Sequence, residues 1–226
     1  MLKHPPKSKF LRFLYENSLS LVVTIFMLGT IVGQAITGWD VWNQELEDMD
    51  KSPLSFLQYL SSGHFIEAIF ENWESEFLQM GLYVMLTIWL RQKGSSESKQ
   101  LYEKEEVDRE PQPKKDAPLP VRMGGFALAV YKQSLSIAFF TLFFLTFFLH
   151  AYGGAEVYNL EQLDQGKETV TVLQYMTTSQ FWFESMQNWQ SEFLSIVSIV
   201  VFSIFLRQKG SPESKPVDAP YDETGE

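Results

Sequence analysis

Four long apolar stretches constrain the fold of this chain more than any other feature. The first (19–36) and the third (126–149) contain no Asp, Glu or Arg, and Lys132 is the one charged residue inside the third. The second (77–90) and the fourth (193–206) have only fourteen residues each. Since a helix needs about 20 residues to cross about 30 Å of hydrocarbon, the first and third are long enough to span a membrane, and the other two are short.

A soluble helical bundle is the alternative to a membrane protein. Each helix of such a bundle needs a polar face along its length, and residues 137–149 (IAFFTLFFLTFFL) have almost none. The mean hydropathy of −0.10 looks soluble only because it averages apolar stretches with polar connections. We therefore expect an all-α membrane protein with four transmembrane helices and short interfacial helices in the outer loops.

The second half of the chain repeats the first. Residues 15–99 align with residues 131–215 without a gap, at an offset of 131 − 15 = 116 positions, and more than a third of the pairs are identical. The block NWESEFL at 72–78 matches NWQSEFL at 188–194. This is the mark of a tandem duplication. Because each unit contains two spans, both units enter and leave on the same side, which predicts parallel repeats.

The duplication predicts the domain organisation. We expect a first two-span unit over 1–99 and a second over 123–215. The sequence between them, 100–122, is rich in charged residues and proline and is expected to be a flexible cytoplasmic linker. The acidic tail, 216–226, is expected to be disordered.

The basic residues predict the orientation. Of the 18 Lys and Arg residues, only Lys51 and Lys167 lie in the two loops opposite the termini, which leaves 18 − 2 = 16 on the other side. The positive-inside rule then places both termini and the linker in the cytoplasm. A cleaved signal peptide is the alternative for the basic N-terminus. The third stretch is equivalent to the first in the repeat, but it is internal and cannot be a signal peptide. We therefore expect the first stretch to be a retained helix.

Capping residues predict where the other helices begin and end. Ser52 followed by Pro53 favours a short interfacial helix running to Leu60. Serines 61–62 and residues 177–179 are expected to cap the helices that contain the second and fourth spans. Each of these helices is followed by a glycine, Gly94 or Gly210, expected just past the helix end. Gly29 and Gly33 are expected to allow close packing against another helix, without marking a specific site.

Two polar stripes are the strongest candidates for a site. At 1.5 Å per residue, Glu76 lies about 22 Å from Arg91 along a helix, which places it inside the hydrocarbon. The same arithmetic places Glu192 there. Polar residues in lipid must face protein or water, so we expect the stripes to face each other at the bundle centre. They consist of Asn72, Ser75, Glu76 and Gln79 with Tyr83, and of Asn188, Ser191, Glu192 and Ser195 with Ser198.

Two functions remain open for these stripes. They can hydrogen-bond helices together in a protein with a structural or interaction role, and this is the leading expectation. Alternatively, Glu76 and Glu192 face a central polar vestibule and bind a cation or share a proton, as in a small channel or transporter. The expected interfacial anchors are Trp73, Trp189, Arg91, Lys93, Arg207 and Lys209, of which the basic residues are also candidates for binding anionic lipid.

Composition excludes several classes of function. The chain has no Cys, and its three His (His4, His64, His150) are scattered, so we expect no metal and no cofactor. His150, at the position of Gln34 in the first unit, is expected to form interfacial hydrogen bonds, with a proton-sensitive role as the alternative. The net charge of −10 argues against nucleic acid. No catalytic motif is present, so we do not expect an enzyme. The expected partners are the lipid bilayer and a second copy or another membrane protein.

The blocks SSGHFIEAIFENWESEFLQM (61–80) and LRQKGSSESK (90–99) resemble those of a family of bacterial membrane proteins known only as a domain of unknown function. The resemblance covers both units. It implies a multi-pass protein of the bacterial inner membrane and supplies no activity, substrate or catalytic residue. The second unit departs from the first block, with Gln180 at the position of His64.

Overall fold

The protein was analysed as a computed structural model that describes residues 8–225. Within this range the secondary structure is entirely helical, as expected from the sequence. The first unit consists of α1 (Lys9–Glu16), α2 (Ser18–Asp48), α3 (Phe56–Tyr59) and α4 (Gly63–Trp89). The second unit consists of α6 (Gly125–Lys132), α7 (Ser134–Asp164), α8 (Val172–Tyr175) and α9 (Ser179–Phe205). The 3-10 helix η1 (Glu106–Asp108) and α5 (Leu119–Met123) lie between them.

The helix bounds repeat along the chain. Helix α7 begins at Ser134 and α2 at Ser18, an offset of 134 − 18 = 116, and every helix from α6 to α9 begins and ends at this offset from its counterpart. Lys132 and Gln133 interrupt the third apolar stretch, so its start forms the separate helix α6. The offset of the structural elements is therefore the same as that of the sequence.

Three helices within the described residues are long and apolar enough to cross a membrane, namely α2, α7 and α9. The protein is thus suited to a membrane-embedded location. Helix α4 is as long as α9, with 27 residues, but does not meet the same requirement. The reason is its first half, which carries Glu67, Glu71, Glu74 and Glu76. A fourth span formed by α4 remains a prediction.

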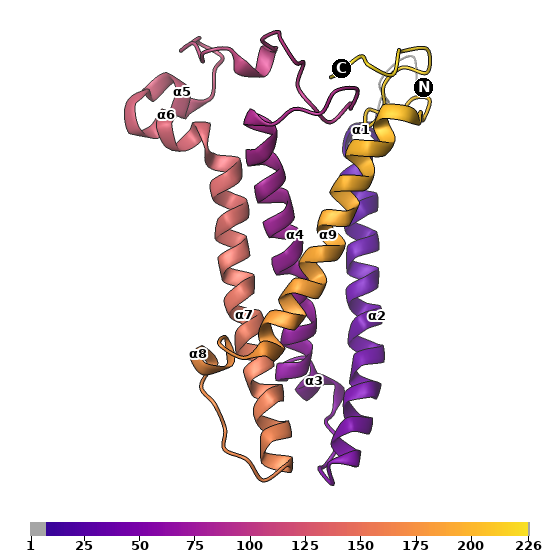
Figure 1. Ribbon diagram of the computed structural model, residues 1–226, viewed down its shortest axis with the longest axis vertical. Coiled ribbons are helices and arrows are strands. Elements are labelled where there is room, and N and C mark those ends of the chain that lie inside the picture. The colour runs from indigo at the N-terminus through magenta and orange to yellow at the C-terminus, as the bar shows by residue number, and fades with distance from the viewer. Residues whose placement is uncertain (1–7, 226) are drawn as a thin grey trace.

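Helices α4, α7 and α9 form the packed part of the molecule. In Figure 1, the C-terminus, α1, α5 and α6 lie at one end of the long helices, and α3 and α8 lie towards the other. Helix α4 packs along α7 over much of its length and crosses α9, whereas α2 contacts α4 at few positions. One of these is a hydrogen bond from Gln34 Nε2 to the carbonyl oxygen of Ala68, 3.0 Å long.

Helices α4 and α7 pack closely together at two glycines. A Cβ atom added at Gly153 would lie 2.5 Å from the backbone nitrogen of Glu67 and 2.6 Å from the carbonyl oxygen of Gly63. A Cβ atom at Gly63 would lie 2.7 Å from the carbonyl oxygen of Gly153. These obstacles are backbone atoms, and Glu156 Cβ lies at the same 2.7 Å from the Gly63 position, so this crossing requires glycine. By contrast, a Cβ atom at Gly29 or Gly33 would meet nothing within 4 Å.

The helix caps agree in part with the sequence predictions. Ser62 and Thr178 accept hydrogen bonds from Phe65 N and Phe181 N and cap α4 and α9, as expected. The predicted cap at Ser52 is wrong. Helix α3 begins after Ser55, whose side chain and backbone both pair with Gln58 in a capping box.

The glycines that follow the two long helices are not C′ residues, contrary to the prediction. Helices α4 and α9 end at Trp89 and Phe205, five residues before Gly94 and Gly210. Both glycines have φ of +87° and lie in a turn, in which Ser95 N donates to the carbonyl oxygen of Gln92 in the first unit. Because glycine adopts positive φ without steric cost, this left-handed turn accounts for a glycine at both positions even though neither is a C′ residue.

The acidic tail contacts the rest of the chain within the described residues, and its disorder remains a prediction. Its end reaches the loop after α4, where Gly94 N donates to Thr224 Oγ1 (2.8 Å) and Gly225 N donates to the carbonyl oxygen of Ser95 (3.1 Å). The ammonium group of buried Lys215 donates to three tail carbonyls, those of Pro220, Tyr221 and Glu223. The acidic composition of the tail does not predict these contacts with backbone groups. The flexibility of the linker remains a prediction.

Candidate metal centre

The candidate centre lies where α4, α7 and α9 meet, beyond the end of the apolar stretch of α7. His150 directly follows that stretch and is fully buried. On α4, three glutamates at positions i, i+4 and i+7 share one face, which is directed at α7 and α9. They are Glu67, Glu71 and Glu74. Helix α9 contributes Glu184 from its second turn.

His150 lies between two carboxylates. Its Nδ1 atom is 3.0 Å from Glu74 Oε2, and its Nε2 atom is 3.4 Å from Glu184 Oε2. Glu74 is also fully buried, and its other oxygen, Oε1, accepts hydrogen bonds from Ser185 Oγ (2.9 Å) and Trp189 Nε1 (3.2 Å). Every oxygen of Glu74 therefore has a partner, and this carboxylate holds the imidazole in place.

Glu184 is positioned by neighbouring side chains of its own unit. Tyr175, from α8, donates its hydroxyl to Glu184 Oε2 at 2.6 Å, and Gln180 Nε2 donates to Oε1 at 2.6 Å. Burial raises the pKa of the Tyr175 phenol, and the hydrogen bond to Glu184 raises it further. The phenol therefore stays protonated and remains a donor near neutral pH.

Glu67 completes a group of three converging ligands. One ligand atom each from Glu67, His150 and Glu184 lies within 4.8 Å of the other two. No other such group of His, Asp or Glu occurs among residues 8–225. Gly154 makes room for this approach, because a Cβ atom there would lie 2.8 Å from Glu67 Oε1 and 2.6 Å from the Tyr175 hydroxyl. The three ligands come from three different helices.

The donor set is suited to a divalent metal ion. Carboxylate oxygens and an imidazole nitrogen are common ligands of Zn²⁺, Mn²⁺ and Fe²⁺. Glu71, one turn after Glu67, lies within electrostatic range of His150 and Glu184 and adds a further carboxylate. Metal-bound histidines in proteins usually donate their second ring N–H to a carboxylate or carbonyl, and Glu74 is placed to accept it.

The sequence-predicted stripes meet each other, but away from this centre. Gln79 Nε2 donates to the carbonyl oxygen of Glu192 (2.9 Å) and to Ser195 Oγ (2.8 Å). The carboxylates of Glu76 and Glu192 lie within electrostatic range of each other. Glu76 is exposed on the protein surface, however, and no third ligand joins the pair.

The remaining stripe residues mostly bond to their own helix. The hydroxyls of Ser75, Ser191 and Ser198 donate to carbonyls three or four residues earlier. The amide groups of Asn72 and Asn188 do the same, to Ala68 and Glu184. These polar side chains are thus satisfied locally, which is expected for Ser and Asn in apolar helices.

The predicted anchors lie in several different settings. Trp189 donates to buried Glu74 and belongs to the centre, and the Arg91 and Arg207 guanidinium groups donate to the last carbonyls of α4 and α9. Such contacts satisfy carbonyl groups that a helix end leaves without partners. Trp73 packs edge-on against Phe70, while Lys93 lies 3.9 Å from Asp222 and Lys209 is exposed.

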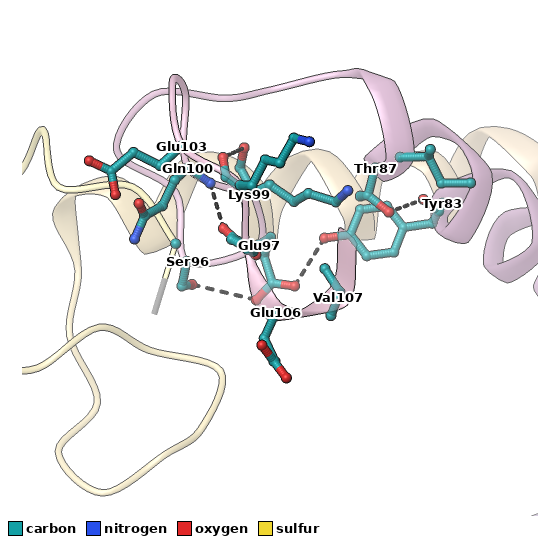
Figure 2. Close-up of a pocket in the computed structure, with 14 residues that line it drawn as sticks. Tyr83, Thr87, Ser96, Glu97, Lys99, Gln100, Glu103, Glu106 and Val107 are labelled. Carbon is teal, nitrogen blue, oxygen red and sulfur yellow. Dashed lines mark hydrogen bonds between the residues drawn. The ribbon is translucent and has the colours of Figure 1, made fainter. Parts of the chain in front are cut away.

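A cavity of about 720 Å³ lies at the opposite end of α4, between the loop that follows this helix and the linker. Figure 2 shows Glu97 between Ser96 and Tyr83. The hydroxyl of Tyr83 donates to Glu97 Oε2 at 2.9 Å. The lining combines acidic residues such as Glu103 with basic Lys99 and Lys104. Since its charges are mixed and no ligand set converges, it is a weaker candidate than the centre at His150.

Comparison with known proteins identifies a family but no function. A family model described as a domain of unknown function (DUF6766) matches residues 10–226. No curated protein and no solved structure matches the chain. The centre around His150 must therefore be interpreted from its own geometry.

Proposed function

The chain belongs to the family described as a domain of unknown function (DUF6766), and we propose that it is a membrane protein that binds a divalent metal ion where α4, α7 and α9 meet. The observation that carries this proposal is the convergence of Glu67, His150 and Glu184, whose ligand atoms lie within 4.8 Å of one another. The proposed function is binding and includes no catalytic step.

Charge supports the same proposal. Glu67, Glu71, Glu74 and Glu184 surround one imidazole, and burying a carboxylate without a full countercharge costs several kcal/mol. A divalent cation between Glu67, Glu184 and His150 Nε2 offsets two of these charges. The apolar surroundings then strengthen the attraction between ion and ligands, because the local dielectric constant is low.

Metal removal tests the proposal. We expect the purified full-length protein in detergent to bind one Zn²⁺ or Mn²⁺ per chain. At a metal concentration 100 times the dissociation constant, binding should stabilise the folded state by about 2.7 kcal/mol over the chelator-treated protein. Thermal unfolding with and without metal, together with metal analysis after dialysis, measures both quantities. A protein that retains no metal and unfolds at the same temperature in both conditions would refute the proposal.

The proposal includes a specific membrane organisation. We place four spans, α2, α4, α7 and α9, in a bacterial inner membrane, as two parallel repeats with both termini and the linker in the cytoplasm. The excess of Lys and Arg on that side supports this orientation. Helices α1 and α6, which begin the described parts of the two units, also lie at one end of the molecule (Figure 1). The centre then lies towards the outer surface.

Partners follow from the same arrangement. The bilayer covers the exposed apolar residues of α2 and α9. Anionic lipid is proposed at Lys93 and Lys209, with Arg91 and Arg207 nearby. A second copy or another membrane protein is proposed to cover the exposed carboxylate of Glu76, because a charged group in lipid must face protein or water.

Transport of the bound cation is a second candidate function. Polar contacts between the units continue along the helices beyond the centre, from Gln79 with Ser195 to Ser95 with Ser203, at 2.8 and 2.9 Å. These contacts also hold α4 and α9 together, which is the structural role expected from the sequence.

Metal uptake into proteoliposomes separates the two roles. Transport predicts flux above that of empty liposomes, and the Gln79→Leu variant should reduce it while still binding metal. Absence of flux in the wild-type protein would reject transport and leave binding in place. Normal flux in the variant would assign Gln79 to helix packing alone.

A further inference from the structure

We infer that Glu74 and His150 together make the centre selective for first-row transition-metal ions over Mg²⁺ and Ca²⁺. This inference rests on the proposed metal-binding function and specifies its ligand. Within it, His150 is a direct ligand and Glu74 is a positioning residue.

The hydrogen bonds of Glu74 determine which nitrogen of His150 faces the centre. Ser185 and Trp189 both donate to Oε1 of Glu74, which leaves Oε2 to accept from His150 Nδ1 at 3.0 Å. With the proton on Nδ1, the lone pair of Nε2 points towards Glu184, 3.4 Å away. Glu74 therefore selects the tautomer that can bind a metal through Nε2.

Packing fixes the plane of the imidazole ring. Phe181, itself fully buried, stacks on His150 with ring centroids 4.9 Å apart and an angle of 30° between the planes. Phe147 packs edge-on against Phe181 from the same side of α7. The imidazole is held from both its edge and its face, so little ordering is needed when a metal binds.

The nitrogen ligand is the source of the selectivity. Mg²⁺ and Ca²⁺ bind oxygen ligands almost exclusively, whereas imidazole suits Zn²⁺, Fe²⁺ and Ni²⁺. Cu⁺ prefers thiolate and thioether ligands, and the chain contains no cysteine. An ion that uses Nε2 together with Glu67 and Glu184 is therefore a borderline transition-metal ion.

The repeat supplies conservative variants for a test. At the offset of 116, His150 corresponds to Gln34 and Glu74 corresponds to Gln190. His150→Gln and Glu74→Gln thus introduce the residue that the other unit carries at the equivalent position of an equivalent helix. Both substitutions keep a polar side chain of similar length.

The experiment measures binding of Zn²⁺, Mn²⁺, Mg²⁺ and Ca²⁺ to the full-length protein. The wild type should bind Zn²⁺ at least about tenfold more tightly than Mg²⁺. His150→Gln should remove this preference by weakening Zn²⁺ binding while leaving Mg²⁺ binding nearly unchanged. Glu74→Gln should weaken Zn²⁺ binding by about 10–100-fold. X-ray absorption of the zinc-loaded protein should show a nitrogen ligand that is lost in His150→Gln.

Each outcome separates this inference from the proposed function. A wild type that binds no divalent ion overturns both. A wild type that binds Mg²⁺ as tightly as Zn²⁺ overturns the selectivity and leaves metal binding intact. If Glu74→Gln weakens all four ions equally, Glu74 is a structural residue and its positioning role is rejected. If Glu74→Gln fails to fold, Trp189→Phe removes one donor to Glu74 and should give a smaller loss, again greater for Zn²⁺ than for Mg²⁺.

Discussion

Replacing Gly153 with valine is expected to destabilise the protein by roughly 3 kcal/mol, because overpacking a tight contact costs about 1–3 kcal/mol and occasionally more. Even the first atom of the new side chain would lie 2.5 Å from the backbone nitrogen of Glu67. Backbone atoms cannot rotate away, so α4 and α7 must separate. Since Glu67 lies at this crossing, the variant should also lose metal affinity. Thermal unfolding in detergent and metal titration measure the two effects.

Gly33→Val is the matched control. Gly33 also lies within a long helix, but a Cβ atom there would meet nothing within 4 Å. We expect its unfolding free energy to change by no more than about 0.5 kcal/mol, as for most surface substitutions. Equal unfolding temperatures for the two variants would show that the close crossing of α4 and α7 does not occur in solution.

The second large effect is expected from two glutamates of the centre. The double variant Glu67→Gln and Glu184→Gln removes two charged ligands from different helices and keeps the size of both side chains. Because each ligand of a metal site contributes strongly to affinity, and even outer-shell partners are worth about 10–100-fold, we expect Zn²⁺ affinity to fall by more than about a thousandfold. Isothermal titration with the full-length protein measures the loss.

The matched control exchanges the pair of glutamates that the sequence favoured. Glu76→Gln with Glu192→Gln makes the same chemical change outside the centre, so the number of removed charges is identical. We expect this variant to bind Zn²⁺ within a few-fold of wild type. If it loses affinity as fully as the first variant, a general effect of negative charge would explain the binding, and the site at His150 would be wrong.

Much of the fold follows from local sequence patterns. The apolar stretches and the offset of 116 predict the long helices of both units, and Ser62 and Thr178 mark where α4 and α9 begin. The remainder depends on tertiary contacts. The tail contacts depend on backbone groups of the loop at Gly94, which composition does not reveal.

The sequence repeat favours other glutamates than those of the centre. Glu76 and Glu192 match each other in the repeat, and this identity makes the two stripes the strongest candidates in the sequence. The converging residues are those in which the units differ. Glu67, Glu71 and Glu74 correspond to Phe183, Gln187 and Gln190, while His150 and Glu184 correspond to Gln34 and Ala68.

The number of histidines does not reveal this group of potential metal ligands. Three scattered histidines argue against a histidine-rich cage, yet one buried imidazole is enough when glutamates supply the other ligands. The spacing of Glu67, Glu71 and Glu74 on one helical face was visible in the sequence. That this face meets His150 depends on how α4 packs against α7, which only the structure shows.

The position of His150 at the end of an apolar stretch has an electrical consequence. An ion that crosses the whole membrane gains or loses about 2.3 kcal/mol per charge for every 100 mV. In the membrane orientation proposed above, the centre lies where the hydrocarbon ends, near the outer surface, so an ion arriving from that side would cross little of that voltage drop. Occupancy should therefore follow the ion concentration outside the cell and stay nearly independent of the membrane potential.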